Sequence, residues 1–79
     1  MKIAVLGAGA WGTAIGIVLH ARHEVRLWAR DAALVEALRT DRVNRRYLPG
    51  FALPDSLALD EDLGVALRGA DLILIAVIT

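Results

Sequence analysis

Hydrophobic and polar positions along the chain alternate between strand-like and helix-like patterns. Two short apolar runs, at residues 2–6 and 24–29, are each followed by a longer stretch whose apolar side chains recur at helical spacing. Alternation of this kind is typical of an α/β fold with a parallel sheet. For the first half we predict a strand at Lys2–Leu6, a helix from about Ala10 to Ala21, a strand from Glu24 to Trp28 or Ala29, and a helix that begins just after Asp31 and ends at Thr40 or Asp41.

The second half begins with an interruption of this pattern. Two prolines, Asn44 and Gly50 disfavour regular structure between residues 42 and 56, so we predict a packed loop there, with apolar side chains as anchors. The strand and helix patterns then resume. We predict a short strand at about Leu57–Leu59, a helix from Asp60 or Glu61 to Leu67 with acids in its first turn, a helix end at Gly69, and a last strand from Asp71 to Val77 or Ile78.

The order of these four strands follows from the handedness of their connections. Right-handed crossovers in a doubly wound sheet give the order 3-2-1-4. The first two helices then share one face of the sheet, and the short third helix covers the other. The fold class is therefore α/β, a partial Rossmann-type parallel sheet of four strands, whose apolar fourth strand lies at an open edge.

Composition limits the classes of function. The 79 residues make one small domain, and with no cysteine and only two histidines we expect neither disulfides nor a metal site. Nine basic and nine acidic residues cancel, so we expect no nucleic-acid partner. No apolar run reaches the ~18 residues that a membrane helix needs, so we expect no membrane insertion. The N-terminus does not have the pattern of a signal peptide.

The turn after the first predicted strand carries the strongest chemical signal. It contains the pattern Gly7-x-Gly9-x-x-Gly12. In a dinucleotide site the first glycine makes the sharp exit from the strand, the second brings the backbone close to the phosphates, and the third lets the helix pack against the sheet. The helix then points its free N–H groups at the anion. Such a pattern is weak alone, but the strand before it and the helix and second strand after it favour a pyrophosphate site.

The end of the second predicted strand bears on the choice of cofactor. A site for NAD usually has an acidic residue here, which binds the ribose 2′-hydroxyl, whereas a cation accommodates the 2′-phosphate of NADP. Arg30 directly follows the expected strand end, so we favour NADP(H) over NAD(H). Asp31 keeps the alternative open. It caps the second helix in one interpretation, and a shift of two residues in the strand end would make it the ribose ligand.

Three motifs together resemble one enzyme family. They are Gly-Ala-Gly-Ala-Trp-Gly-Thr-Ala at 7–14, Trp-Ala-Arg at 28–30 and Asn-Arg-Arg-Tyr-Leu-Pro-Gly at 44–50. The combination resembles the N-terminal part of bacterial NAD(P)-dependent glycerol-3-phosphate dehydrogenase. The resemblance implies a cytoplasmic enzyme that interconverts dihydroxyacetone phosphate and sn-glycerol 3-phosphate by hydride transfer, for phospholipid synthesis. It also implies that residues 1–79 are the first part of a Rossmann domain, and that the catalytic lysines and a helical substrate domain belong to sequence beyond Thr79.

The resemblance implies cofactor contacts but no catalytic residue in this chain. For Trp11 two interpretations stay open, a lid on the pyrophosphate and a residue packed under the turn. Tyr47 is a core anchor of the proline-containing loop or a contact of the cofactor. The residues expected to line the pyrophosphate turn are Gly7, Gly9, Ala10, Trp11, Gly12 and Thr13, with Arg30 beside the adenosine ribose.

Several polar residues are expected to lie outside the site. His20 and His23 flank the end of the first helix, at the amino ends of the strands, whereas the cofactor of such a fold lies at the carboxyl ends. Lys2 is likewise expected at the amino ends of the strands, away from the cofactor. We expect residues 44–46, Asn-Arg-Arg, to be loop and surface residues.

The chain departs from the family pattern at two places. It lacks a glycine before His23, and it has Ile78-Thr79 where a proline is usual.

Two alternative functions also remain open. A structural module that forms a homodimer through its open fourth strand is one alternative. A Rossmann fragment of another dehydrogenase of the superfamily, acting on a hydroxy acid, is the other, and the Tyr-Leu-Pro-Gly stretch at 47–50 argues against it.

Overall fold

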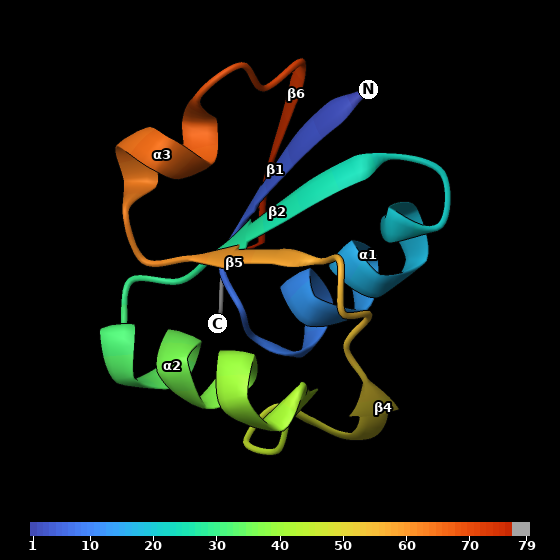
Figure 1. Cartoon of the computed structure of the whole chain (residues 1–79), viewed down its shortest axis with the longest axis vertical. Helices are drawn as coiled ribbons and strands as arrows, with labels where there is room; N and C mark the ends of the chain where they lie inside the picture. The colour runs from blue at the N-terminus through green and yellow to red at the C-terminus, as the bar shows by residue number, and fades with distance from the viewer. Residues whose placement is uncertain (77–79) are drawn as a thin grey trace.

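The structure, a computed structural model, describes residues 1–76 (Figure 1). The first helices and strands confirm the prediction to within a residue, since Ala21 is the C-cap of α1. The predicted end of the last strand at Val77 or Ile78 lies outside the described residues. In chain order the elements are β1 (Lys2–Leu6), α1 (Ala10–His20), β2 (Glu24–Trp28), α2 (Ala32–Asp41), β3 (Val43–Asn44), β4 (Leu48–Ala52), β5 (Ala58–Asp60), α3 (Leu63–Leu67) and β6 (Leu72–Ile75).

Four strands form one parallel sheet in the order β5-β2-β1-β6. This is the predicted order 3-2-1-4, so the α/β Rossmann-type fold is confirmed. The register pairs Leu6 with Trp28 on one side and with Ile75 on the other, and it pairs Trp28 with Asp60. The carboxyl ends of all four strands therefore lie level with one another, at a single edge of the sheet.

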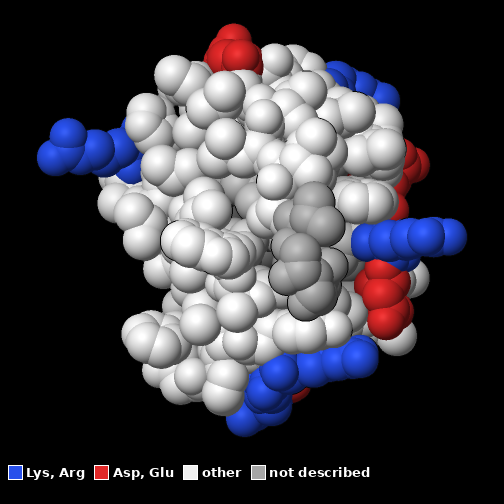
Figure 2. All heavy atoms as spheres, turned by 180° about the vertical axis from the view of Figure 1, so that it is seen from behind, with Lys and Arg blue, Asp and Glu red and all other residues white. Residues whose placement is uncertain are grey.

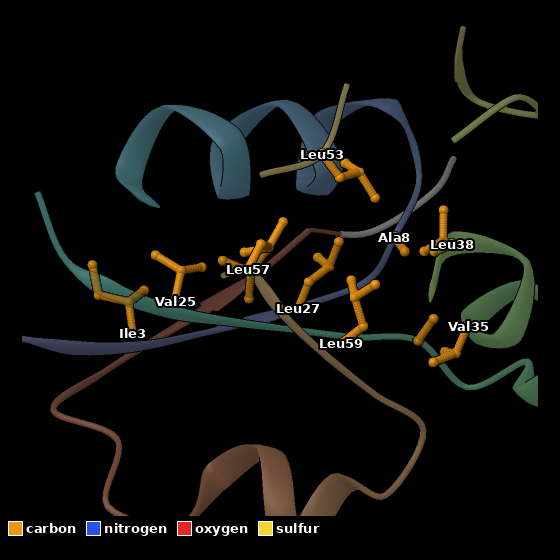
Figure 3. Close-up of a cluster of buried hydrophobic side chains, with 11 residues drawn as sticks. Ile3, Ala8, Val25, Leu27, Val35, Leu38, Leu53, Leu57 and Leu59 are labelled. Atoms are coloured by element: carbon orange, nitrogen blue, oxygen red, sulfur yellow. The ribbon is translucent and has the colours of Figure 1, made fainter. Parts of the chain in front are cut away.

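The main core lies between this sheet and the first two helices. Alternation along β1 and β2 directs Ile3, Val25 and Leu27 to the face that α1 and α2 cover, and Figure 3 shows these side chains beneath α1. Leu57, which precedes β5, is also buried in this cluster, as is Leu38 of α2. Burial of this cluster is the main source of the stability of the domain.

Among residues 1–76, the opposite face of the sheet carries only α3, as predicted (Figure 1). The alternate residues of β2 point this way, and two of them bind α3 or the turn before it through polar atoms. Nη1 of Arg26 donates to the carbonyl oxygen of Val65 at 2.6 Å, and Nε1 of Trp28 donates to that of Glu61 at 3.0 Å. The short helix is thus fastened by long side chains that reach out from the sheet, with Ala66 as its buried residue.

The segment predicted as an irregular packed loop contains an antiparallel hairpin, β3 and β4, so that prediction is wrong for these residues. The hairpin begins at Arg42, which has the left-handed conformation (φ 53°) and ends α2. Its guanidinium donates to the carbonyl oxygens of Pro54 and Leu57 at 3.1 and 3.0 Å, and its own carbonyl accepts from Leu53 N at 2.7 Å. These bonds close the base of the hairpin. A local sequence pattern does not predict such bonds.

The start of α3 also differs from the prediction. The helix begins at Leu63 and has no acid in its first turn. Asp62 is the N-cap, whose side chain accepts from Val65 N at 3.1 Å, and Asp60 Oδ1 accepts from Asp62 N at 2.9 Å. The acids therefore build the turn before the helix and do not belong to it. The predicted end is confirmed, because Gly69 follows the helix with a positive φ of 70°.

The exit from α1 needs no glycine. Ala21 keeps right-handed helical angles (φ −59°, ψ −26°), and the amides of Arg22 and His23 both donate to the carbonyl oxygen of Leu19, at 3.1 and 3.0 Å. The departure from the family pattern before His23 is therefore accommodated without a left-handed residue. Within residues 1–76, no helix is long and apolar enough to cross a membrane.

Candidate functional site

The glycine turn connects β1 to α1 at the carboxyl edge of the sheet. Gly7 has a positive φ of 117°, and its amide donates to the carbonyl oxygen of Trp28 at 2.8 Å. A Cβ at Gly7 would overlap the carbonyl oxygen of Ala76, and one at Gly12 would overlap the carbonyl oxygen of Gly7. Both positions therefore require glycine, the first for its conformation and the second for the close approach of α1 to the turn.

The N-terminus of α1 is the one helix start without a side-chain cap among the three described helices. Gly9 is the N-cap, in an extended conformation, and the first bond of the helix runs from Thr13 N to Gly9 O at 3.0 Å. In an α-helix the amides before that bond have no acceptor within the helix. Because α2 and α3 are capped by the carboxylates of Asp31 and Asp62, only α1 presents its first amides to an external anion.

A cavity of about 600 Å³ opens beside this turn, at the carboxyl ends of β1, β2 and β6. Four residues predicted for the site line it, namely Gly7, Arg30, Asp31 and Tyr47. Arg46 lines it as well, although residues 44–46 were expected to be loop and surface residues rather than ligands. The cavity thus joins the glycine turn, the end of β2 and the β3–β4 hairpin.

The other predicted residues lie beside this cavity without lining it. Trp11 is 74% exposed, so it is not packed under the turn, and it lines an adjoining apolar cavity of about 360 Å³. The two cavities share Ile75 and Ala76. Ala10 is exposed at the start of α1, whereas Gly9, Gly12 and Thr13 are buried.

A buried polar cluster ties the hairpin to the glycine turn. Asn44 and Thr13 are both fully buried. Nδ2 of Asn44 donates to the carbonyl oxygen of Ala8 and to Oγ1 of Thr13, both at 2.8 Å, and its Oδ1 accepts from Tyr47 N at 3.2 Å. The expectation of a surface role for Asn44 is therefore wrong. The signal in the sequence is the spacing of Asn44 and Tyr47, which suits a side-chain-to-backbone bond within a turn.

The segment after β2 carries Arg30 and Asp31 to the cavity. The amide of Ala29 donates to the carbonyl oxygen of Asp60 at 3.1 Å, which fixes the start of this segment against β5. Oδ1 of Asp31 accepts from Ala33 N at 2.9 Å and from Leu34 N at 3.3 Å, so its role as a helix cap is confirmed. Arg30 is exposed, and no ion pair of its guanidinium occurs within the described part of the chain.

The remaining candidate residues lie at the opposite edge of the sheet, as expected. Lys2, His20 and His23 line a separate cavity at the amino ends of the strands. Nζ of Lys2 lies 3.9 Å from Oε2 of Glu24, and Nε2 of His20 lies 3.0 Å from Oγ of Ser56. Across residues 1–76 no group of three or more His, Asp or Glu side chains is arranged to hold a metal ion.

Comparisons with known proteins agree on one family. A family model described as NAD-dependent glycerol-3-phosphate dehydrogenase N-terminus matches residues 2–79. The glycerol-3-phosphate dehydrogenase [NAD(P)+] of Burkholderia cenocepacia is 63% identical over 67 residues, which are 85% of this chain and 20% of that protein. Relatives from Burkholderia and Aromatoleum and the solved structures described below bear this enzyme's name, which does not favour a dehydrogenase of hydroxy acids.

Solved structures give the same result. The glycerol-3-phosphate dehydrogenase of Coxiella burnetii is 43% identical with a TM-score of 0.87, over 94% of this chain and 23% of that one. That of Saccharomyces cerevisiae is 30% identical with a TM-score of 0.84, over 98% of this chain and 26% of that one. This chain thus spans about a fifth to a quarter of the length of the proteins that it matches. Its uncapped glycine turn and its match over residues 2–79 lead to one conclusion: the chain belongs to the family of N-terminal regions of NAD-dependent glycerol-3-phosphate dehydrogenases.

Proposed function

We propose that residues 1–79 form the cofactor-binding part of an NAD(P)-dependent glycerol-3-phosphate dehydrogenase of the cytoplasm. The observation that carries the proposal is the uncapped N-terminus of α1, which opens next to the cavity of about 600 Å³ at the strand ends. A pyrophosphate group fits this place because Gly7 and Gly12 hold the turn close to the helix, where a Cβ would not be accommodated. The whole enzyme would interconvert dihydroxyacetone phosphate and sn-glycerol 3-phosphate.

In this proposal the turn binds the pyrophosphate with backbone amides. The first amides of α1, from Gly9 to Gly12, point along the helix axis towards the anion. Trp11 is exposed and lines the adjoining cavity, and we propose that its ring covers the bound pyrophosphate from there. Thr13 supports the turn from beneath, because it is fully buried and its hydroxyl accepts from Nδ2 of Asn44.

The chain contributes binding and orientation, and we assign it no catalytic residue. A bound nicotinamide supplies the hydride, but reduction of a ketone also needs a donor near the carbonyl oxygen. The one lysine among the 79 residues, Lys2, lies at the opposite edge of the sheet. We therefore propose that the catalytic lysines and the substrate domain belong to other parts of the enzyme, with residues 1–79 as the first part of its Rossmann domain.

We further propose a preference for NADP(H) over NAD(H). Arg30 lines the cavity at the end of β2, where the adenosine ribose of a Rossmann cofactor lies, and its guanidinium suits a 2′-phosphate. Asp31, the alternative ligand for a ribose hydroxyl, already accepts two amides of α2 with Oδ1. The cap role thus weakens the case for NAD(H).

Titration of the 79-residue chain with NADPH and NADH tests the proposal. We expect saturable binding of both, and Arg30→Ala is expected to raise the Kd of NADPH about tenfold and that of NADH less than about twofold. Arg22→Ala removes the same charge at the opposite edge of the sheet and serves as the control. Absence of saturable binding up to millimolar concentration would overturn the cofactor site. Equal losses for the two cofactors would overturn the preference alone.

A second candidate, association of two copies through β6, rests on the exposure of that strand. Leu72, Ile73 and Ile75 are 41%, 47% and 72% exposed, and β6 is one of the two outer strands of the sheet among residues 1–76. Figure 2, seen from behind the view of Figure 1, shows a face on which charged side chains lie at the rim. Sedimentation at high concentration tests this candidate, and a monodisperse monomer would exclude it.

A further inference from the structure

The β3–β4 hairpin brings a second arginine to the cavity at the strand ends. Arg46, which lies between the two hairpin strands, lines this cavity together with Arg30, which follows β2. Asp31 is the one carboxylate that lines it in the described part of the chain. Two guanidinium groups from separate segments therefore border the same space, against a single acid.

We propose that Arg46 is a specificity-determining residue that binds the 2′-phosphate of an NADP-type cofactor together with Arg30. This inference rests on the proposed function, because it needs the adenosine ribose at the end of β2. A phosphomonoester carries between one and two negative charges at neutral pH and has three acceptor oxygens. One guanidinium fork occupies at most two of these oxygens, so a second arginine adds both charge and hydrogen bonds.

The hairpin holds Arg46 through two nearby residues, Asn44 and Tyr47. Asn44 is fully buried and is bonded to the glycine turn at Ala8 and to Thr13 of α1, and its Oδ1 accepts from Tyr47 N. The Arg46 guanidinium lies over the Tyr47 ring, 5.1 Å from its centroid. A cation held over an aromatic face has fewer conformations to lose on binding, so the phosphate meets a partly ordered arginine.

The other arginines of this region already have partners. Nε of Arg45 lies 3.4 Å from Oδ2 of Asp41, and Arg42 donates to two carbonyl oxygens at the base of the hairpin. Arg39 lies close to the carboxylates of Glu36 and Glu61. Within residues 1–76, neither Arg46 nor Arg30 forms an ion pair. These two are thus the cations of the cavity that an external phosphate can engage.

The negative charge of Asp31 does not cancel the positive charges of Arg30 and Arg46 in the cavity. Oδ1 of Asp31 accepts from two amides of α2, Ala33 N at 2.9 Å and Leu34 N at 3.3 Å. This carboxylate is thereby directed to the positive end of its own helix, where it is stabilised. A second negative group next to it is favourable only if cations surround both, and Arg30 and Arg46 supply them.

Calorimetric titration of the 79-residue chain with NADPH and NADH tests the inference. Arg46→Ala is expected to raise the Kd of NADPH about tenfold and to change that of NADH less than about twofold. Arg45→Ala removes the same charge from the adjacent position and is expected to leave both constants within about twofold, because that side chain faces Asp41. Arg46→Lys keeps the charge without the planar fork and is expected to retain part of the NADPH affinity.

The outcomes separate this inference from the proposed function. If Arg46→Ala weakens the two cofactors equally, or weakens neither, the role of Arg46 in specificity is overturned while the cofactor site stands. If the unaltered chain binds neither cofactor, both proposals are overturned. Arg46→Gln replaces the alanine variant if circular dichroism shows that the latter is unfolded, and it is judged by the same ratio of constants.

Discussion

Replacement of Gly12 by alanine tests the packing on which the cofactor turn depends. Gly12 lies in the first turn of α1 and faces the glycine turn itself. A Cβ built there would overlap the carbonyl oxygen of Gly7, would lie 2.9 Å from its carbonyl carbon and would lie 3.2 Å from Cβ of Ala76. The nearest atoms belong to the backbone, which cannot rotate away, so α1 and the turn would have to separate.

Gly16 is a matched control in the same helix. A Cβ at Gly16 would meet the methyl groups of Leu57 at 3.9 Å and of Val25 at 4.0 Å, which are ordinary van der Waals distances. Exchange of glycine for alanine inside a helix stabilises a protein by about 0.5–1 kcal/mol. Overpacking costs about 1–3 kcal/mol or more, and the rigid contact at Gly12 places that variant at the upper end. The two substitutions therefore change the stability in opposite directions.

Thermal unfolding followed by circular dichroism measures the difference. For a domain of this size 1 kcal/mol shifts Tm by about 4–8 °C, so Gly16→Ala is expected to raise Tm by about 2–8 °C and Gly12→Ala to lower it by about 12–24 °C. In the titration with NADPH, Gly12→Ala is expected to lose binding at temperatures where it is still folded. If Gly12→Ala is as stable as the unaltered chain and binds NADPH as tightly, α1 does not pack so closely on the turn that position 12 requires glycine, and the reasoning is refuted.

Three further predictions concern other contacts of the site. Asn44→Leu leaves the carbonyl of Ala8 and the hydroxyl of Thr13 without the amide that binds them, so urea unfolding is expected to show a loss of about 2–4 kcal/mol, and a loss below 0.5 kcal/mol would contradict the buried network. Asp31→Ala is expected to cost about 1 kcal/mol through loss of the α2 cap, with Asp62→Ala as a comparison at α3, and an unchanged Tm would contradict the cap. NADPH at about 100 times its Kd is expected to stabilise the chain by about 2.7 kcal/mol, and an unchanged Tm at that concentration would contradict specific binding to the folded state.

The sheet and the glycine turn were predictable from the sequence because their signals are local. The apolar runs, the glycines at 7, 9 and 12 and the charged residues at 30 and 31 lie within single elements or the turns between them. Strand order then followed from a general rule of handedness, and the structure confirms it. Periodicity and turn chemistry thus sufficed for the part of the fold in which each element is specified by its own residues.

The hairpin was not predictable in this way, because its conformation depends on hydrogen bonds to residues that are distant in the sequence. Asn44 reads as a turn residue, yet it is buried by bonds to Ala8 and Thr13, 36 and 31 positions earlier in the chain. Arg42 takes a conformation that usually favours glycine, and its guanidinium is held by carbonyls 12 and 15 positions later. The presence of Arg46 at the cavity is a consequence of these contacts, so no local pattern could have shown it.

The missing side-chain cap at Gly9 has a practical consequence for anyone who measures this protein. Sulfate and inorganic phosphate in a buffer are expected to bind the same uncapped amides as a nucleotide, since the helix distinguishes anions by charge and size and not by identity. Apparent affinities taken in phosphate buffer should therefore be weaker than those taken in a buffer of bulky organic ions. High sulfate should also protect the empty protein against heat, which makes the choice of salt a variable to be controlled.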